Sequence, residues 1–369
     1  VDKVIQKCIV KNLDILNLSG MKLYELPNLL SYSEQIFNLV EINLSNNNLF
    51  DSTKLFEILS QFPKLKRLNL SNNYLNGCLD GLAGNIITLE ELRLDSNQLT
   101  SLPTTVRNWK HLKIFSVSDN NLQVLPEEIK EWSHIVTVNF RKNRISQLPA
   151  QAFEGWSRVQ KISLSFNRIE ELPESIGSCP SLTELDLCSN MLTVLPESLR
   201  LCRHLRRLNL AANKITELSP NILGSLSHLK DLQIYRNKIT SLPPEIGNLR
   251  ELTKLSLSSN NLKALPEEIG DCISLQELYL NNNAKFTTIP GSAGHLRNLQ
   301  ELSLRKCPAL KQLPLTAQDL TSLRELDLRA PKKQVCKIAP EVHEILKSNN
   351  CIIRGGVVAK LRAKKQTTT

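Results

Sequence analysis

One spaced motif recurs along almost the whole chain and decides what it can fold into. The motif orders its leucines and an asparagine as L-x-x-L-x-L-x-x-N-x-L, as in LTKLSLSSNNL from Leu252 to Leu262. Such a period indicates a solenoid, because one unit can bury its leucines only against neighbouring units. The ninth position recurs fourteen times, at steps of 23 to 26 residues: Met21, Asn47, Asn73, Asn97, Asn120, Asn143, Asn167, Asn190, Asn213, Asn237, Asn260, Asn283, Cys307 and Pro331.

The motif also predicts the local structure of each unit. Every x-L-x-L-x segment favours a short strand whose two leucines point inward, and successive strands are expected to stack in parallel about 4.8 Å apart. Most units then read L-P-x-x-I/L-x-x-L, as in LPPEIGNL from Leu242 to Leu249. The Pro favours an extended entry into a short helical or 3-10 piece. The expected fold class is therefore α/β, with a parallel sheet on the concave face of a horseshoe and these pieces on its convex face.

Irregularities in the grid mark the ends of the array. After the last unit, a helix from about Pro340 and a strand from about Cys351 to Arg354 are expected to cover the open core face. The last thirteen residues form a loose basic tail, either a solubilising end or a site for nucleic acid or anionic lipid. The expected organisation is an N-terminal cap over 1–12, an array of about 14 units over 13–331, a C-terminal cap over 332–356 and the tail over 357–369.

Composition narrows the function. Residues 332–369 carry +7 of the formal net charge of +10, so the array is nearly neutral and, with 5% aromatic residues, is not expected to bind nucleic acid. No stretch approaches the roughly 18 consecutive apolar residues that span a bilayer. The nine cysteines are spread singly, which favours a reducing compartment and a cytoplasmic location. No phosphate loop, nucleophile elbow or kinase signature is present, so neither an enzyme nor a cofactor is predicted.

Two repeat positions collect residues that often carry chemistry. One position, just before the first leucine of a unit, holds pairs of His on adjacent units that could share a metal ion, but no carboxylate or thiol recurs with ligand spacing. A second position, on the convex side, holds Trp and Cys, for which core packing is favoured over binding or redox roles. The residues are His111, His134, His204 and His228 at the first position, and Trp109, Trp132, Trp156, Cys179, Cys202 and Cys272 at the second.

The concave face should do the work of binding, since solenoids offer this extended surface to partners. Its exposed positions are mostly Ser, Asn and charged residues, among which a few aromatic and Arg residues stand out. These types are enriched at interface hot spots, although scattered surface aromatics are also normal. The predicted partner-binding residues are Arg141, Phe166, Arg207, Tyr235, Arg236 and Tyr279.

The form LPxEIGxLxxLxxLxLxxNxL resembles the intracellular Ras-group leucine-rich repeat proteins of plants and the animal Ras–Raf scaffold. The segments LPEEIGDCISLQELYL and LPPEIGNLRELTKLSL carry this likeness. The resemblance implies that the Asn amides hydrogen-bond neighbouring backbone in a ladder along the solenoid. It also implies a non-enzymatic scaffold that holds signalling proteins, including small GTPases and a phosphatase subunit.

We therefore predict a scaffold or adaptor that binds proteins through the concave face. The segment LRKCPALKQLP is similar instead to plant immune-receptor and bacterial effector repeats. The alternative prediction is accordingly a substrate-recognition module of a ubiquitin-ligase or effector system.

Overall fold

The computed structural model describes residues 1–32, 34–77, 79–330 and 335–359. The ladder position Pro331 and the tail from Lys360 onward lie outside these ranges. The chain divides into two compact units, Val1–Leu192 and Thr193–Thr369, which are described separately.

In the first unit the motif forms one parallel sheet, and each middle leucine-type residue faces its equivalent on the next strand. Leu16 pairs in register with Ile42, and Ile42 with Leu68. A one-residue slip would turn every inward leucine to solvent, so burial fixes the register. The strands, in sheet order, are β1 (Ile15–Asn17), β2 (Glu41–Asn43), β3 (Arg67–Asn69), β5 (Glu91–Arg93), β7 (Ile114–Ser116), β8 (Thr137–Asn139), β9 (Lys161–Ser163) and β10 (Glu184–Asp186), with β4 (Asn76–Gly77) and β6 (Gln98–Leu99) paired separately.

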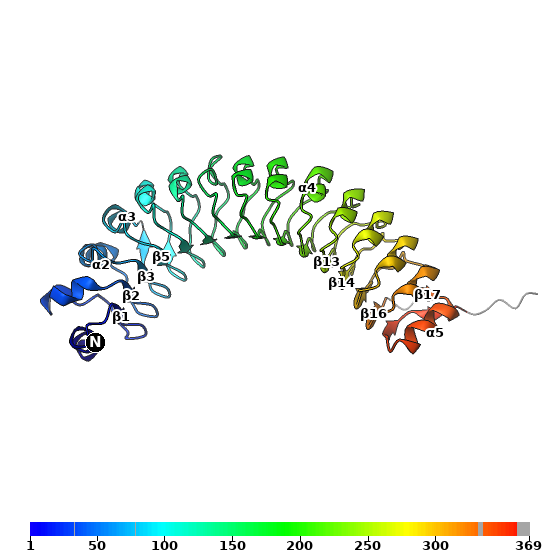
Figure 1. Cartoon of the computed structure of the whole chain (residues 1–369), viewed down its shortest axis with the longest axis horizontal. Coiled ribbons are helices and arrows are strands. Elements are labelled where there is room, and N and C mark those ends of the chain that lie inside the picture. The colour runs from blue at the N-terminus through cyan, green and yellow to red at the C-terminus, as the bar shows by residue number, and fades with distance from the viewer. Residues whose placement is uncertain (33, 78, 331–334, 360–369) are drawn as a thin grey trace, which may run out of the picture. The chain divides into compact units, whose positions relative to one another are not determined.

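Short helical segments lie on the other side of this unit, away from the sheet face (Figure 1). Three of them, η3 (Thr104–Asn108), η4 (Glu127–Glu131) and η5 (Glu174–Ser178), are short 3-10 segments that begin after a proline in extended conformation, such as Pro126 before Glu127. The second repeat of the array is longer and has room for an α-helix, α2 (Ser52–Leu59). The Asp51 carboxylate caps the first backbone N–H groups of this helix. The other helices are α1 (Asp2–Val10), η1 (Leu29–Ser31), η2 (Glu34–Asn38) and α3 (Asp80–Asn85).

The second unit repeats this plan. Its sheet comprises, in order, β11 (Arg207–Asn209), β12 (Asp231–Gln233), β13 (Lys254–Ser256), β14 (Glu277–Tyr279), β15 (Glu301–Ser303), β16 (Glu325–Leu328) and β18 (Ile352–Gly355), and β17 (Lys337–Ile338) pairs with β19 (Val357–Val358). Its helices are η6 (Glu197–Leu201), α4 (Pro220–Ser225), η7 (Pro244–Asn248), η8 (Glu267–Asp271), η9 (Gly291–His295), η10 (Leu315–Asp319) and α5 (Pro340–Ser348).

The Trp and Cys position on the helical side is core. Trp132 is fully buried between Trp109 and Trp156, with ring centroids 6.4 and 6.1 Å away, and its Nε1–H donates to the Val106 carbonyl. The cysteines are equally buried, and burial raises the pKa of the Cys272 thiol to about 12. A thiol held protonated in this way is a poor nucleophile, so packing is the role of this position.

The Asn ladder implied by the resemblance is present. Asn260, which is 5% exposed, donates through Nδ2 to the carbonyls of Ile234 and Leu257, both at 2.9 Å, and its Oδ1 accepts the Ile239 N–H at 3.0 Å. At the thirteenth position Cys307 continues the ladder with its thiol, which donates to the Leu280 carbonyl at 3.2 Å. Asn260 and Cys307 thus satisfy backbone groups that no strand pairing reaches.

Both ends of the array are covered. Helix α1 buries Ile5 and Cys8 at the first end, and α5 buries Val342 and Leu346 at the other. Strand β18 lies beside β16, close to where the sequence places a capping strand. One detail differs from the expectation of a loose tail from residue 357: Val357 and Val358 form β19, because their backbone pairs with β17.

A small apolar cavity in the second unit follows from two alanines. Ala293 and Ala317 occupy the helical-side position that holds a larger apolar residue in the preceding repeats, such as Ile246 and Ile269. The missing side-chain atoms leave a void lined by Leu278, Ile289, Leu296, Leu302, Leu313, Leu320 and neighbouring apolar residues.

We expect Ala317→Val to raise the free energy of unfolding by about 0.5–1 kcal/mol, measured by urea denaturation. The matched variant Ile269→Ala should lower it by about 2–5 kcal/mol, and a loss of stability in Ala317→Val would show that the void is already too small for two methyl groups.

Candidate protein-interaction surface

The sheet face of each unit presents the residues on either side of the inward leucine. On β2, for example, Ile42 is buried while Glu41 and Asn43 are half-exposed. Because neighbouring strands are in register, residues at one motif position form a column that crosses successive strands about 4.8 Å apart. The chemistry of this face therefore depends on which residue types follow one another along a column.

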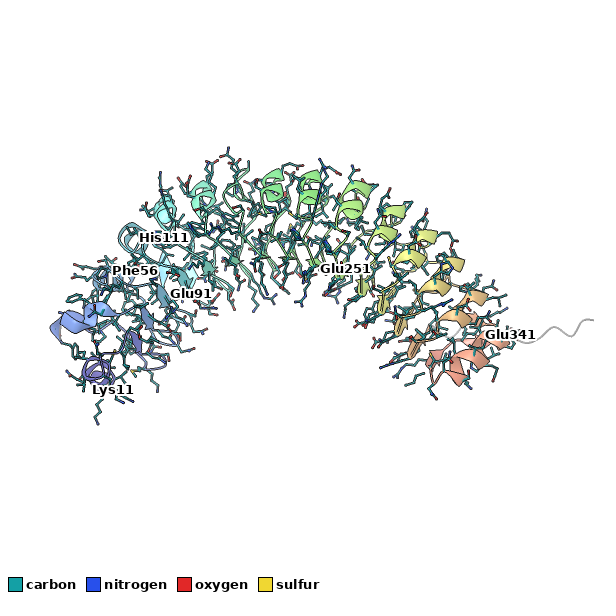
Figure 2. The ribbon with its side chains drawn as sticks, viewed as in Figure 1. Lys11, Phe56, Glu91, His111, Glu251 and Glu341 are labelled. Atoms are coloured by element: carbon teal, nitrogen blue, oxygen red, sulfur yellow. The ribbon has the colours of Figure 1, made fainter. Side chains whose placement is uncertain are left out.

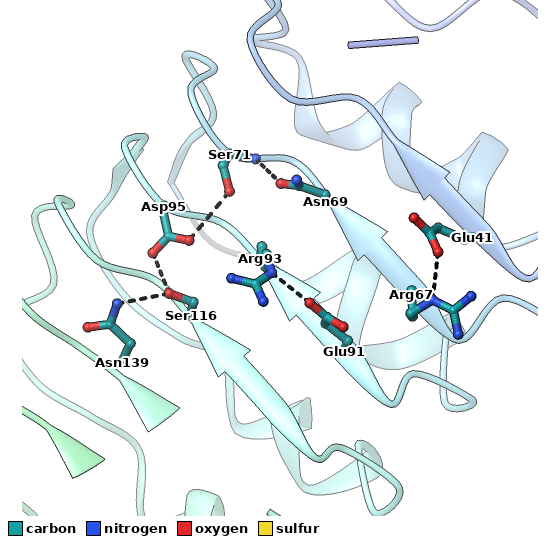
Figure 3. Close-up of polar contacts among 9 residues, drawn as sticks. All are labelled: Glu41, Arg67, Asn69, Ser71, Glu91, Arg93, Asp95, Ser116 and Asn139. Carbon is teal, nitrogen blue, oxygen red and sulfur yellow. Dashed lines mark hydrogen bonds and ion pairs between the residues drawn. The ribbon is translucent and has the colours of Figure 1, made fainter. Parts of the chain in front are cut away.

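In the first unit the residues that begin β2, β3 and β5, which are Glu41, Arg67 and Glu91, alternate in charge. The Arg67 Nε donates to the Glu41 carboxylate at 2.6 Å across two strands, and the Arg93 Nε donates to Glu91 at 2.6 Å along one strand (Figure 3). These side chains line an open pocket together with Asn43 and Asn69. Exposed ion pairs contribute little stability. Their ordered geometry is instead suited to recognising a partner with matching charge pairs.

A second polar cluster lies at the ends of the same strands. The Asp95 carboxylate accepts hydrogen bonds from the hydroxyls of Ser71, Ser116 and Ser118, and Asn139 Nδ2 donates to Ser116 Oγ at 3.1 Å (Figure 3). One carboxylate thus accepts from three serine hydroxyls of neighbouring repeats, and Asn139 is linked to it through Ser116. The cluster makes this part of the sheet face rigid, which lowers the entropy cost of binding.

A carboxylate between two cations lies just before the strands. Glu90 forms ion pairs with Lys113 at 2.6 Å and with Lys66 at 2.9 Å. The hydrogen bonds from Lys113 and Lys66 lower the pKa of Glu90 to about 2. The carboxylate is therefore charged at any physiological pH, and this three-strand contact is not a proton donor or acceptor for chemistry.

Two predicted residues of the first unit lie together. The Arg141 guanidinium carbon lies 4.3 Å from the centre of the Phe166 ring, a cation–π contact. Phe166 is 43% exposed and precedes the ladder residue Asn167, in a left-handed turn with φ of 57°. It therefore lies at the turn after β9 and not on the strand, so the aromatic–Arg pair lies at an exposed edge of the sheet face.

In the second unit Tyr279 is held in a carboxylate network. Its hydroxyl lies 2.5 Å from a Glu301 oxygen and 3.0 Å from a Glu277 oxygen, and Lys254 pairs with Glu277 at 2.6 Å. Burial and these two carboxylates raise the pKa of Tyr279, while the Lys254 hydrogen bond lowers the pKa of Glu277. The hydroxyl is already engaged, so a partner would meet the ring and the carboxylates.

The other predicted residues of this unit occupy three different positions. Arg207 begins β11 and is exposed, Tyr235 follows β12 and is half-buried, and Arg236 is an exposed turn residue with φ of 57°. Strands β12 and β13 separate Arg207 from Tyr279 on β14. Tyr235 and Arg236 are adjacent in sequence, but the four residues do not form one compact cluster.

Sequence reasoning missed a run of like charges. Glu277, Glu301 and Glu325 face one another in register on three adjacent strands. Lys254 neutralises one end, and Arg354 pairs with Glu325 at 2.8 Å at the other. The sequence carries this signal in the repeated Glu-Leu of ELYL, ELSL and ELDL. It becomes visible only when residues at the same motif position are compared from one repeat to the next.

The histidine pairs are close but lack a third ligand. The ring centroids of His111 and His134 lie 6.0 Å apart, and those of His204 and His228 lie 6.2 Å apart. His228 Nδ1 also lies 2.8 Å from Glu251, which is labelled in Figure 2. Among the residues that the structure describes, no three His, Cys, Asp or Glu side chains gather as metal ligands.

Two further observations concern the cysteine thiols and the lengths of the helices. All eight cysteines within the described ranges are free thiols, while Cys78 falls outside them. None of the described helices is long and apolar enough to cross a membrane.

Known families and structures match the repeat fold. A family model described as a leucine-rich repeat region matches residues 197–348. A second leucine-rich repeat model matches residues 133–195, and a third matches two segments, 38–62 and 64–85. No curated protein sequence matches the chain. The fold predicted from the motif is therefore confirmed.

Solved structures share this architecture. A leucine-rich repeat protein of Leptospira interrogans is 27% identical with a TM-score of 0.64, and the match covers 94% of this chain and 97% of that one. An internalin of Listeria monocytogenes is 16% identical with a TM-score of 0.67, covering 89% and 84%. Toll, in the Drosophila Toll–Spätzle complex, is 22% identical with a TM-score of 0.75, covering 95% of this chain and 48% of that one.

Proposed function

Because the chain is built of leucine-rich repeats, a fold used for protein–protein interaction, we propose that it is a non-enzymatic scaffold or adaptor. Partner proteins bind the exposed sheet face. The observation that carries the proposal is the composition of this face, where ordered ion pairs surround a few aromatic and Arg side chains. The pair of Phe166 and Arg141 illustrates it, with the guanidinium 4.3 Å from a ring that is 43% exposed.

Among the described residues, many polar groups on and beside the same face are engaged with one another rather than arranged for chemistry. Its carboxylates are engaged by cations or hydroxyls, as Glu90 is by Lys66 and Lys113. The described cysteines are buried, and burial raises the pKa of several of their thiols, such as Cys202. These features support a binding role over catalysis.

The double variant Tyr235→Ala and Arg236→Ala tests the proposal. Truncating an aromatic or Arg hot spot costs about 1–2 kcal/mol or more per residue, so the pair should weaken partner binding at least about tenfold. Partners are first captured with the intact chain from a lysate and identified by mass spectrometry. The affinity of the purified partner is then measured for each variant by interferometry.

The matched control is Ser258→Ala with Ser259→Ala, which changes the same two motif positions in the next repeat of the array. This control should bind like the intact chain. Equal affinities for both double variants, with unchanged circular dichroism, would remove Tyr235 and Arg236 from the interface. A separate variant, Phe166→Ala, tests by the same affinity measurement whether the first compact unit contributes to partner binding.

The partner class that we propose is a small GTPase or a phosphatase catalytic subunit in a reducing, cytoplasmic compartment. Support comes from the likeness of the LPxEIG repeats to Ras-group proteins and from the free cysteines. GTPases loaded with each nucleotide are the direct probes. Indifference to every GTPase and phosphatase tested would leave the second candidate, a substrate-recognition module of a ubiquitin-ligase or effector system. Capture of ubiquitin-transfer enzymes would favour that candidate.

A further inference from the structure

In the second unit, the turns that follow the strands are strongly basic. We call the five stretches 211–216, 235–240, 258–263, 281–286 and 305–310 the turn edge, because each surrounds or includes the ladder position of its unit. The turn edge contains neither Asp nor Glu. It contains seven cations: Lys214, Arg236, Lys238, Lys263, Lys285, Arg305 and Lys306.

These cations are directed to solvent. All seven residues are exposed, whereas the ladder residues between them, such as Asn237 and Asn260, are buried. Within the described residues, none of the seven forms an ion pair. By contrast, exposed cations of the neighbouring sheet face do so, as Lys254 does with Glu277 and Arg354 with Glu325. The turn edge thus carries positive charge without ion pairs, although Arg305 is close enough to Asp327 to help lower the pKa of that carboxyl.

Acidic residues of the same unit gather on the helical side. Glu197, Glu245 and Glu267 lie in the first turns of η6, η7 and η8, and Glu268 and Asp271 also belong to η8. Other carboxylates of the unit, such as Glu277, Glu301 and Glu325, lie on the sheet strands, so the acidic residues occupy the helices and strands while the unpaired cations follow the turns. Such a separation directs an anionic partner to one edge of the solenoid.

We propose that the turn edge binds an acidic, extended segment of a partner protein. Successive turns are about 4.8 Å apart, so five of them span about 19 Å, the length of about six extended residues. Glu and Asp side chains along such a segment meet one or two cations per unit. This surface is distinct from the sheet face and goes beyond the proposed scaffold function, although Arg236 belongs to both surfaces.

The described side chains favour a protein over nucleic acid. Single strands are bound by stacking bases on exposed aromatic rings, but Tyr235 is half-buried and Phe286 is fully buried, and the turn edge has no other ring. Duplexes are read by a helix or ribbon that enters a groove. The turn edge consists of short turns and has neither.

The test compares two triple charge reversals in the full chain. The first, Lys214→Glu, Lys238→Glu and Lys263→Glu, changes the turn edge and leaves Arg236 intact. The matched control, Arg203→Glu, Arg250→Glu and Arg297→Glu, makes the same change in net charge at exposed positions that precede the strands. The basic residues after residue 359 are present in every variant, so their contribution cancels in the comparison.

The probe is a fluorescein-labelled oligo-glutamate peptide, and the readout is anisotropy over a range of salt concentrations. We expect binding that weakens as salt rises and an affinity about tenfold lower for the turn-edge variant, since three exposed ion pairs are lost. The control variant should lose less than about threefold. A neutral variant, with Gln at the same three lysines, should lie between these values and guards against misfolding of the charge reversal.

Two outcomes would overturn the proposal. Equal losses for the turn-edge and control variants would mean that only net charge matters. Tighter binding of an oligothymidine or of phosphatidylserine vesicles than of the peptide would assign the surface to nucleic acid or membrane. Either result leaves the Tyr235 and Arg236 test of the sheet face unaffected.

Discussion

Replacing Asn260 with Ala is expected to lower the free energy of unfolding by about 3–5 kcal/mol, because buried groups that lose their partners carry a desolvation penalty of about 1–3 kcal/mol each. The side chain accepts from the Ile239 N–H and donates to the carbonyls of Ile234 and Leu257. Alanine can replace none of these bonds. The N–H and carbonyl groups that lose their partner lie inside the solenoid, where water does not reach them easily.

The neighbouring Asn261 provides the control. Its side chain is exposed, and its hydrogen bond to the Ile239 carbonyl uses the backbone N–H, which an Asn261→Ala variant keeps. This variant should change stability by less than about 0.5 kcal/mol. Both values come from chemical denaturation followed by circular dichroism. Similar losses for the two variants would mean that the ladder does not carry the energy assigned to it.

Ending the chain after Ala339 is expected to lower the free energy of unfolding by about 5 kcal/mol or more. The truncation removes the buried side chains of Val342 and Leu346, each worth about 1.5–3 kcal/mol. It also removes β18 and so leaves the backbone of β16 as an open sheet edge. Since each unit is stabilised by its neighbours, the loss should spread inward from this end, and the exposed edge should promote association.

Ending the chain after Ala359 is the matched control, because it keeps α5, β18 and β19. Its melting temperature should equal that of the full chain. A third truncation, after Gly356, removes the backbone pairing of Val357 with Cys336 and of Ala359 with Ile338, and its midpoint should lie between the other two. Full stability of the Ala339 truncation would contradict the capping role of α5 and β18.

The solenoid itself could be predicted because its signal is redundant. Fourteen copies of one motif fix the strand, the ladder position and the inward leucines, so an irregular unit such as the one with Cys307 does not obscure the pattern. The Trp and Cys position was predicted as core for the same reason. A local preference that is weak in one repeat predicts the architecture strongly when it recurs at a fixed period.

The details of the binding surface depend on contacts that no single unit reveals. Phe166 was predicted on the concave face, yet its contact with Arg141 and its left-handed turn arise from how neighbouring units meet. Tyr279 was predicted as an exposed partner-binding aromatic, and the sequence did not reveal that its hydroxyl lies beside Glu277 and Glu301 on two strands. The pairing of Val357 with β17 was missed because two-residue strands have no distinctive pattern.

The backbone at the residue before each ladder position suggests how such an array can diversify. This residue has positive φ in twelve successive units without being glycine, and it includes Phe166, Arg236 and Lys142. A left-handed conformation costs an ordinary side chain about 1 kcal/mol relative to glycine. The array therefore carries a distributed reserve of strain, which glycine substitutions would release one unit at a time. Mutation can exchange the side chains at these positions without disturbing the leucines, so affinity for partners can drift while the fold stays fixed.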